Sequence, residues 1–319
     1  ARIARVWPGH MAAILFLFAI FWPFSLSLLH GPVLLRRLAA TIAMLQAWSP
    51  VRATYWALNT QSWSISVEFA FYVAFPFLLP RLARRPLGGL AMILGVALAV
   101  ATAIGAQWPN VDPVWLGYIN PVINLPDFTL GIVLALWLRR AGPASGGFAR
   151  ASAIELAALA LALAGNVLGG MLSSASSGGL PGWLSEYLSV ATGVPFYALL
   201  IVALARYRGI VSRALSLRPI VYLGEISYTL YLFHQPMIRA HSGYPTWHSG
   251  WKGWVASLPI WDQYALLLGT TLALVIAVHH LIEQPARRRI NALWRRHRTA
   301  VDPVPPPAIV GGVRQGDLP

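Results

Sequence analysis

Three ionisable side chains lie inside long apolar runs of a chain that contains only 10 acidic residues among 319. Glu68 falls in "SWSISVEFAFYVAFPFLL", His234 in "LGEISYTLYLFHQPM" and Glu283 in "IEQPARR". Ionisable groups inside membrane segments are costly, so they usually face the interior of a helix bundle and mark a functional site. A carboxylate near an imidazole can serve as an acid/base pair, or can orient the imidazole for proton transfer.

A polar stripe accompanies His234. Ser227, Tyr231 and His234 follow i, i+4, i+7 spacing and therefore share one helix face, and Tyr228 lies close to it. Such a stripe in an apolar helix should point at a cavity or a partner helix. We take these four residues, with Glu68, as the candidate catalytic residues. Ser and Tyr also serve as interhelical hydrogen-bonding groups in membranes, and this alternative stays open for Ser227 and Tyr228.

A second candidate site lies at the N-terminus. Arg2 and Arg5 are three residues apart and lie on one side of a helix. Guanidinium groups bind phosphate bidentately, so the pair suits a phosphorylated ligand arriving from the cytoplasm. Glu283 is expected at the same membrane face, where Pro285 should end or bend the helix. The alternatives are arginines that only orient the first helix and a Glu283 that only pairs with local arginines.

The elements that must position these residues are membrane helices. The chain is 57% hydrophobic and 11% charged, whereas soluble domains carry roughly 25% charged residues. We predict an all-α, polytopic transmembrane helix bundle, with a short interfacial or re-entrant helix at 38–48 on the outer face. About eight spans are expected, at 11–29, 63–80, 87–106, 126–138, 153–170, 188–205, 220–238 and 263–283.

Charge predicts the orientation of these spans. With them in place, 19 of the 24 basic residues fall on one side. The positive-inside rule then predicts that both termini are cytoplasmic. Glu68 and His234 are then predicted to lie roughly 7 Å and 6 Å below the outer membrane boundary. Similar depth does not by itself establish that the two side chains are in contact. The net charge of +14 is compatible with nucleic-acid binding as a function. The basic residues, however, form short clusters between apolar runs and not one long basic face, which argues against that function.

The outer connections are rich in aromatic residues and proline, notably "QWPNVDPVWLGYINPVINLPD" and "HSGYPTWHSGWKGWVASLPIWDQ". They are either an interfacial aromatic belt or a platform that faces a sugar. No metal site is expected: the chain has no cysteine, and the adjacent His279 and His280 point to different helix faces.

Six blocks in order make the chain similar to the acyltransferase 3 family of integral membrane acyltransferases. They are "RIARVWP", "LQAWSP", "SWSISVEFAFYVAFPFLL", "LPDFTLGIVLA", "LGEISYTLYLFHQPM" and "IEQPARR". The resemblance implies an acyl-CoA donor, with acetyl-CoA expected, on the cytoplasmic side of a bacterial inner membrane. It also implies a hydroxyl acceptor on a glycan or lipid-linked sugar, and it assigns Arg2 and Arg5, with Glu283, to the donor side.

The resemblance is incomplete at the N-terminus. The family usually has ten spans, and the first carries an Arg followed eleven positions later by a His thought to be catalytic; no such pair occurs here. We expect residues 1–290 to form a transmembrane acyltransferase domain without the family's first two spans, and to be inactive alone. A basic, then Pro/Gly-rich cytoplasmic tail is expected over 291–319.

Two other classes of function remain open at this point. A transporter or flippase for a glycolipid or small solute could use interior acids and a His as a proton relay. A catalytically inactive scaffold for a polysaccharide assembly complex is the third interpretation.

Overall fold

The computed structural model describes residues 2–20, 32–175, 179–242 and 249–301. These residues form helices and no strand, which confirms the all-α prediction. Six segments are long and apolar enough to cross a membrane. They are Thr60–Arg84, Pro86–Gln107, Trp115–Ala141, Phe148–Ser174, Gly182–Arg206 and Ile260–Leu293. Each contains one of the predicted spans, so the protein is an integral membrane protein.

Two predicted spans differ from these six. The span expected at 220–238 lies within one continuous helix, α12 (Arg218–His241), whose polar side chains keep it outside that set. The span expected at 11–29 corresponds to α1 (Arg2–Ile20), whose apolar part, Val6–Ile20, is shorter within the described residues. Residues 21–29 of that prediction lie outside the described part of the chain.

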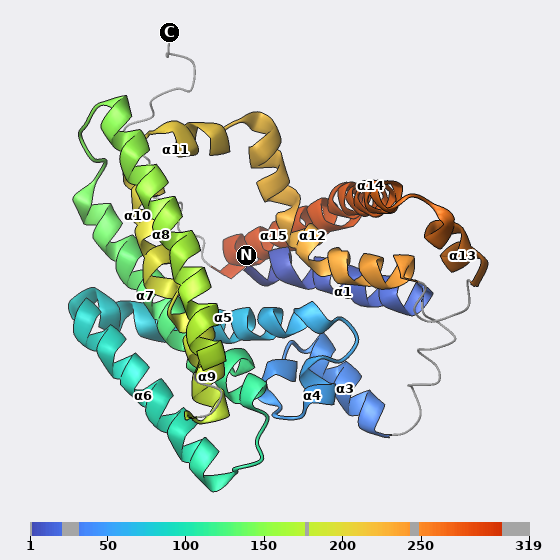
Figure 1. Cartoon of the computed structure of the whole chain (residues 1–319), viewed down its shortest axis with the longest axis horizontal. Coiled ribbons are helices and arrows are strands. Elements are labelled where there is room, and N and C mark those ends of the chain that lie inside the picture. The colour runs from blue at the N-terminus through green and yellow to red at the C-terminus, as the bar shows by residue number, and fades with distance from the viewer. Residues whose placement is uncertain (1, 21–31, 176–178, 243–248, 302–319) are drawn as a thin grey trace.

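The helices form two groups (Figure 1). In the first, α6 (Pro86–Gln107) packs on α7 (Pro121–Ala141), and α8 (Phe148–Ala175) packs on α9 (Gly182–Ala191) and α10 (Val194–Arg206). In the second, α12 packs on α1 and on α14 (Ile260–Val278).

The helix α5 (Trp63–Arg84) connects the two groups. It packs on α6 and α7, and the short turn η2 (Thr60–Ser62) that precedes it contacts α12. The start of α5 is therefore the place where the apolar bundle meets the helix that carries the polar stripe.

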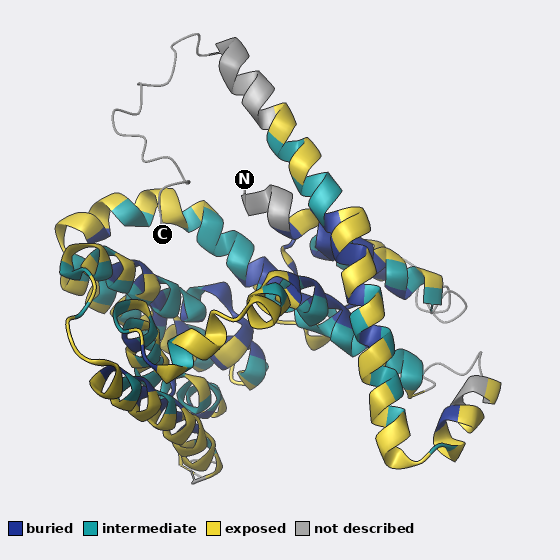
Figure 2. Ribbon diagram, turned by 90° about the horizontal axis from the view of Figure 1, so that it is seen from above, coloured by how far each residue is buried: buried dark blue, intermediate teal, exposed yellow. Residues whose placement is uncertain are grey.

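Many residues of the helices are exposed (Figure 2), and in the first group these include large apolar side chains. On α8, Leu161, Leu163 and Val167 are all exposed. Contiguous exposed apolar side chains are unfavourable in water, but they suit contact with lipid chains. The exposure pattern thus agrees with a bundle that is surrounded by membrane.

The predicted outer loop at 107–127 contains more helix than expected. A π-turn, η3 (Trp115–Ile119), leads into α7, whose first residue is Pro121. Asn120 caps α7 by accepting a hydrogen bond from the Val122 amide at 2.8 Å. Gly117 allows close packing of η3, because a Cβ there would lie 2.1 Å from the Trp183 carbonyl oxygen. The predicted span 126–138 is consequently the end of a longer helix.

The region expected as one helix at 38–48 is divided into two. The helix α3 (Pro32–Ile42) ends, and after a turn the short 3₁₀ segment η1 (Gln46–Trp48) follows, then α4 (Arg52–Tyr55). Met44 lies between them at a φ of 57°, a conformation that cannot continue a right-handed helix. This break turns Gln46 toward the start of α5, where its side-chain amide donates to the Ser62 carbonyl at 2.6 Å.

Candidate active site

Two groups of polar side chains lie along α12, and the first, the His234 cluster, consists of Gln61, Ser64, Tyr231 and His234. The Tyr231 hydroxyl lies 2.8 Å from the Ser64 hydroxyl and donates to the Gln61 carbonyl at 3.1 Å. The Gln61 side-chain amide lies 3.4 Å from His234 Nε2. These contacts join α12 to η2 and α5 across some 170 residues of sequence, so Tyr231 and His234 face the segment at which α5 begins.

The hydrogen bonds of His234 define its tautomer. Its Nδ1 lies 2.7 Å from the Tyr231 carbonyl oxygen, which can only accept a hydrogen bond. Nδ1 must therefore carry the proton, and in the neutral ring Nε2 keeps its lone pair. That lone pair faces the Gln61 amide in a half-buried position. An imidazole held in this way is suited to take a proton from a hydroxyl that displaces the Gln61 amide.

Glu68 lies one turn along α5 from Ser64 and thus on the same helix face. Its carboxylate accepts a hydrogen bond from Tyr72, one further turn along that face. Within the described residues no hydrogen bond or ion pair joins Glu68 to His234. Glu68 is half-buried, so its carboxylate is not sealed inside the bundle.

The second group, the Glu283 cluster, consists of Thr229, His279, Glu283 and Gln284. Glu283 Oε2 accepts a hydrogen bond from the Thr229 hydroxyl at 2.5 Å and lies 2.9 Å from His279 Nδ1. His279 Nε2 in turn lies 3.0 Å from the Gln284 amide. Glu283 and His279 are each 2% exposed and Thr229 is fully buried. The cluster is closed, because its members are partners of one another.

A π-turn, η4 (His279–Glu283), builds this cluster. It joins α14 to α15 (Gln284–Val301), and the Gln284 amide donates to the His279 carbonyl five residues back. Proline lacks an amide proton and clashes with the carbonyl four residues before it, and a widened turn ahead of Pro285 relieves that conflict. The helix therefore does not end at Pro285 but continues through residue 290, the boundary that we expected between domain and tail.

The helices that carry the candidate donor-side residues, Arg2, Arg5 and Glu283, pack against one another. The helix α1 packs on η4 and α15, so the backbone of Arg2 and Arg5 belongs to the same assembly as Glu283. The side chains of both arginines lie outside the described residues. The Tyr228 hydroxyl donates to the Val6 carbonyl at 2.6 Å. Tyr228 thus connects α12 to α1, as the alternative interpretation of this residue expected.

Ser227 and His10 belong to neither cluster. The Ser227 hydroxyl is exposed and donates to the Gly224 carbonyl of its own helix at 2.8 Å. His10 is fully buried, and its Nε2 lies 2.9 Å from the Thr41 carbonyl, so it connects α1 to α3. Among the described residues no group of three or more His, Cys, Asp or Glu side chains could hold a metal ion.

Sequence reasoning missed the partners in both clusters and one further acid. Thr229 is distant in sequence from Glu283, so no local pattern pairs these two residues. His279 lies four residues before Glu283, and this helical spacing was the local signal that could have paired them. Glu155 did carry a signal, since it lies inside the predicted span 153–170. It is fully buried and accepts hydrogen bonds from the amides of Gly209, Val211 and Ser212 at 2.7, 2.9 and 3.1 Å.

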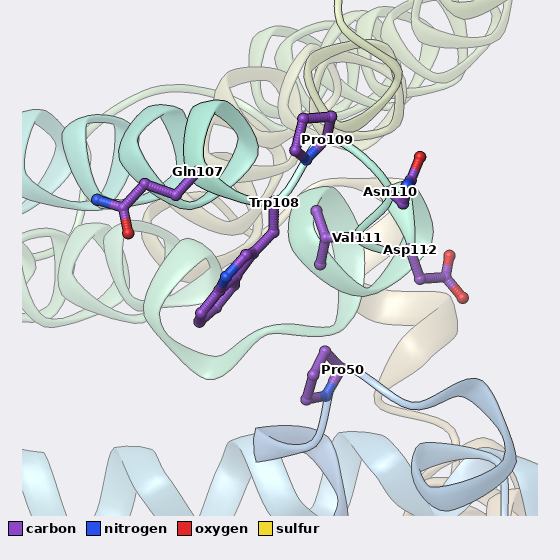
Figure 3. Close-up of a pocket in the computed structure, with 7 residues that line it drawn as sticks. All are labelled: Pro50, Gln107, Trp108, Pro109, Asn110, Val111 and Asp112. Atoms are coloured by element: carbon purple, nitrogen blue, oxygen red, sulfur yellow. The ribbon is translucent and has the colours of Figure 1, made fainter.

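A pocket of about 470 Å³ lies at the end of α6, lined by Pro50 and residues 107–112. Trp108 projects from the end of α6 into the space above Pro50, whereas Asp112 points to the other side (Figure 3). There Asp112 accepts two hydrogen bonds from Arg52, at 2.8 and 3.1 Å, and one from Tyr55 at 2.7 Å. The Arg52 guanidinium holds the pKa of the Asp112 carboxyl below its usual range. These bonds attach the 107–112 loop to α4.

Comparison with known proteins identifies the kind of enzyme. Residues 1–280 match the family model for the acyltransferase domain of the acyltransferase 3 family. The chain is 28% identical to acyltransferase MdmB of Streptomyces mycarofaciens, over 95% of this chain and 76% of that protein. It is 29% identical to exopolysaccharide production protein ExoZ of Rhizobium meliloti, over 81% of this chain and 71% of that protein.

No solved structure matches this chain significantly. The family match covers well over half of the sequence, and it confirms the resemblance inferred from the six sequence blocks. The chain belongs to the acyltransferase 3 family and is a membrane acyltransferase.

Proposed function

We propose that this protein moves an acyl group, specifically acetyl, from cytoplasmic acetyl-CoA to a hydroxyl of a glycan or lipid-linked sugar on the other side of a bacterial inner membrane, with both termini cytoplasmic. The observation that carries the proposal is the contact of His234 Nδ1 with the Tyr231 carbonyl oxygen at 2.7 Å, which assigns the proton to Nδ1 and leaves Nε2, now 3.4 Å from the Gln61 amide, to accept the proton of a substrate hydroxyl that displaces this amide. The relative ExoZ, named for exopolysaccharide production, supports a carbohydrate acceptor.

In the proposed step, His234 Nε2 takes the proton of the acceptor hydroxyl while its oxygen attacks the thioester carbonyl carbon. The new C–O bond forms, the C–S bond breaks, and the coenzyme A thiolate leaves with the proton that His234 took up, which regenerates the neutral imidazole. Gln61 and Tyr231, which contact His234, hold the ring and the incoming hydroxyl in place. Glu68, on the α5 face that begins with Ser64, supplies a carboxylate to orient the acceptor.

The donor side of the proposal uses the α1–η4 assembly. Arg2 and Arg5 bind the phosphates of acyl-CoA, and the closed Glu283 cluster holds η4 in position against α1. Tyr228, through its bond to the Val6 carbonyl, keeps this assembly on α12. Thr229 and His234 are five residues apart, or roughly 8 Å along the axis of α12. One helix thereby connects the donor-side and acceptor-side groups.

The acceptor side of the proposal includes the pocket beside Pro50. An exposed indole offers an apolar face to a sugar ring, and Trp108 is 59% exposed. The Gln107 and Asn110 amides in the same lining can hydrogen-bond to hydroxyl groups. We assign this pocket to an outer sugar unit of the acceptor.

The test uses membranes from cells that carry the complete gene, incubated with radiolabelled acetyl-CoA and extracted glycan or lipid-linked sugar. The double change Arg2→Ala and Arg5→Ala is expected to raise the KM for acetyl-CoA, because two phosphate contacts are lost. A matched control, Arg36→Ala, removes an exposed charge from α3 and should keep the wild-type KM. An unchanged KM in the double variant would refute the donor assignment.

Glu68→Gln tests the acceptor side in the same assay. The amide keeps the size of the side chain but removes its charge, so acceptor acylation should fall at least 10-fold while the KM for acetyl-CoA stays the same. Wild-type turnover would leave Glu68 a structural role only. Solute transport by the protein without any acylated product would overturn the proposal as a whole.

A further inference from the structure

A basic pocket lies at the far end of the first helix group, away from both polar clusters. Its volume is about 900 Å³, and it lies between the α7–α8 connection and the α10–α11 connection. The helix α11 (Ile210–Leu215) follows α10 there (Figure 1). Three arginines line the pocket: Arg206, Arg208 and Arg213.

The hydrogen bonds of the two connections hold this pocket together. Arg206 Nε donates to the Gly142 carbonyl at 3.2 Å, and the Ala144 amide donates to the Arg206 carbonyl at 3.0 Å. The guanidinium of Arg206 lies over the ring of Trp137, and that of Arg213 lies 4.3 Å from the ring centroid of Phe148. Two of the three cations are therefore positioned by the fold.

The nearest buried acid does not neutralise the arginines. Glu155 directs both carboxylate oxygens to the start of α11, where they also accept a hydrogen bond from the Ser212 hydroxyl at 2.7 Å. Gly209 permits this approach, because a Cβ there would lie 2.6 Å from Glu155 Oε2. Among the described residues, none of the three guanidinium groups has a carboxylate within 4.0 Å.

The surroundings of the pocket are those of a membrane boundary. The pocket opens at the ends of α8 and α10, and each belongs to a segment long enough to span the membrane. Phe148 and Leu204 add apolar surface to the lining, and exposed Ile201, three residues before Leu204, continues that surface along α10. Uncompensated cations next to an apolar helix surface suit a ligand that joins a phosphate to hydrocarbon chains.

We propose that this pocket binds the phosphate headgroup of an anionic phospholipid, with Arg208 and Arg213 as its principal contacts and the acyl chains along α8 and α10. This site is separate from the acyl-transfer groups on α12 and does not depend on the proposed function. Free coenzyme A also carries phosphates but lacks the two long chains, so its binding distinguishes the two sources of phosphate.

The test is native mass spectrometry of the detergent-solubilised full chain, titrated with phosphatidylglycerol, phosphatidylcholine or coenzyme A. The double change Arg208→Gln and Arg213→Gln should weaken phosphatidylglycerol binding about 30-fold, at roughly fivefold per arginine. Phosphatidylcholine, which is zwitterionic, should bind weakly and equally to both proteins.

The matched control is Arg139→Gln with Arg140→Gln, which removes the same charge from the exposed end of α7 and should bind like wild type. Equal losses in the two double variants would overturn the proposal, since the attraction would then be non-local. Displacement of phosphatidylglycerol by coenzyme A would also overturn it. If the pocket double variant does not fold, Arg208→Gln alone, at an exposed position, should still show the fivefold loss.

Discussion

The two polar clusters of α12 differ in how completely their groups satisfy one another. In the Glu283 cluster, Thr229, His279 and Glu283 are buried, and the Thr229 hydroxyl and His279 Nδ1 each bond to Glu283 Oε2 within 3.0 Å. In the His234 cluster, Tyr231 and His234 are half-buried, and the contact between Gln61 and His234 is long, at 3.4 Å. The same helix thus carries one closed network and one open network.

This difference suggests that the Glu283 cluster stabilises the fold and that the His234 cluster takes part in the reaction. A closed buried network gains stability from every bond and loses it when one partner is removed, because the remaining polar groups are left unsatisfied. An open network with one weak contact can exchange that contact for a substrate. We therefore expect changes in the Glu283 cluster to lower stability and changes in the His234 cluster to lower turnover.

The largest expected effect comes from the base. His234→Ala removes the proton acceptor, so acyl transfer should fall by roughly 10²- to 10⁴-fold with little change in thermal stability. Turnover is measured with acetyl-CoA and acceptor in the same membrane assay, with the complete gene, and stability by thermal unfolding of the purified protein. His280→Ala, at an exposed position of η4, is the control and should remain active. If His234→Ala also lowered the thermal stability of the protein, the two clusters would not differ in function as we infer.

The second effect concerns the closed network. Glu283→Ala leaves Thr229 and His279 without their shared acceptor, and should lower the free energy of unfolding by about 3 kcal/mol. Glu283→Gln keeps an oxygen for Thr229 and should cost less. Denaturant unfolding in detergent compares the two variants. If Glu283→Ala unfolds like wild type, the cluster does not support the α1–η4 assembly.

A smaller effect is expected from Tyr231→Phe. The change deletes the hydroxyl that contacts Ser64 and the Gln61 carbonyl. One lost hydrogen bond is worth about 1 kcal/mol, so turnover should fall roughly fivefold as Gln61 becomes less well oriented. Tyr264→Phe, at an exposed site on α14, is the matched control. A loss as large as that of His234→Ala would place the Tyr231 hydroxyl in the chemistry itself.

The smallest effect extends the comparison to the outer pocket, where Asp112 attaches the 107–112 loop to α4. Its pKa is lowered by Arg52, so the attachment is fully present above the ordinary Asp pKa of about 3.9. It is lost only as the pH falls through the lower pKa of the folded protein.

Hydrogen exchange of residues 107–112 checks this prediction. Protection should stay constant from neutral pH to about pH 4 and fall only in stronger acid, after correction for the intrinsic pH dependence of exchange. Asp112→Asn should lower protection wherever Asp112 is ionised in the wild type, and the two proteins should converge in strong acid, because the substitution removes the charge that Arg52 binds. A loss of protection near pH 6 would show that a titrating group other than Asp112 holds the 107–112 loop.

Much of the fold could be predicted because the relevant signals are local. The expected span at 87–106 is almost the whole of α6, and 153–170 falls inside α8. The prediction failed where an irregular turn continued a helix, as at η3, or where it interrupted one, as at Met44. Aromatic, Gly and Asn residues at 115–120 resemble a loop in sequence, and only the Asn120 cap and the contact with Trp183 show otherwise.

The candidate site was predictable in its members but not in its pairs. Helical spacing alone placed Ser227, Tyr231 and His234 on one face. The same spacing did not show that Tyr231 reaches Ser64, because that contact depends on where α12 crosses the start of α5. Tyr228 turned instead to α1, although it is only three residues from Tyr231.

The membrane class, most of the spans, the acyltransferase family and the acids and histidines inside apolar helices could all be inferred from the sequence alone. These properties depend on the length of apolar runs, on charge counts and on motifs read along the chain. The three-dimensional packing was needed to show that Glu283 pairs with Thr229, that His234 faces Gln61, and that Glu155 holds the start of α11. Such pairs depend on the rotation and crossing of helices that are far apart in sequence, and packing of the whole bundle sets both.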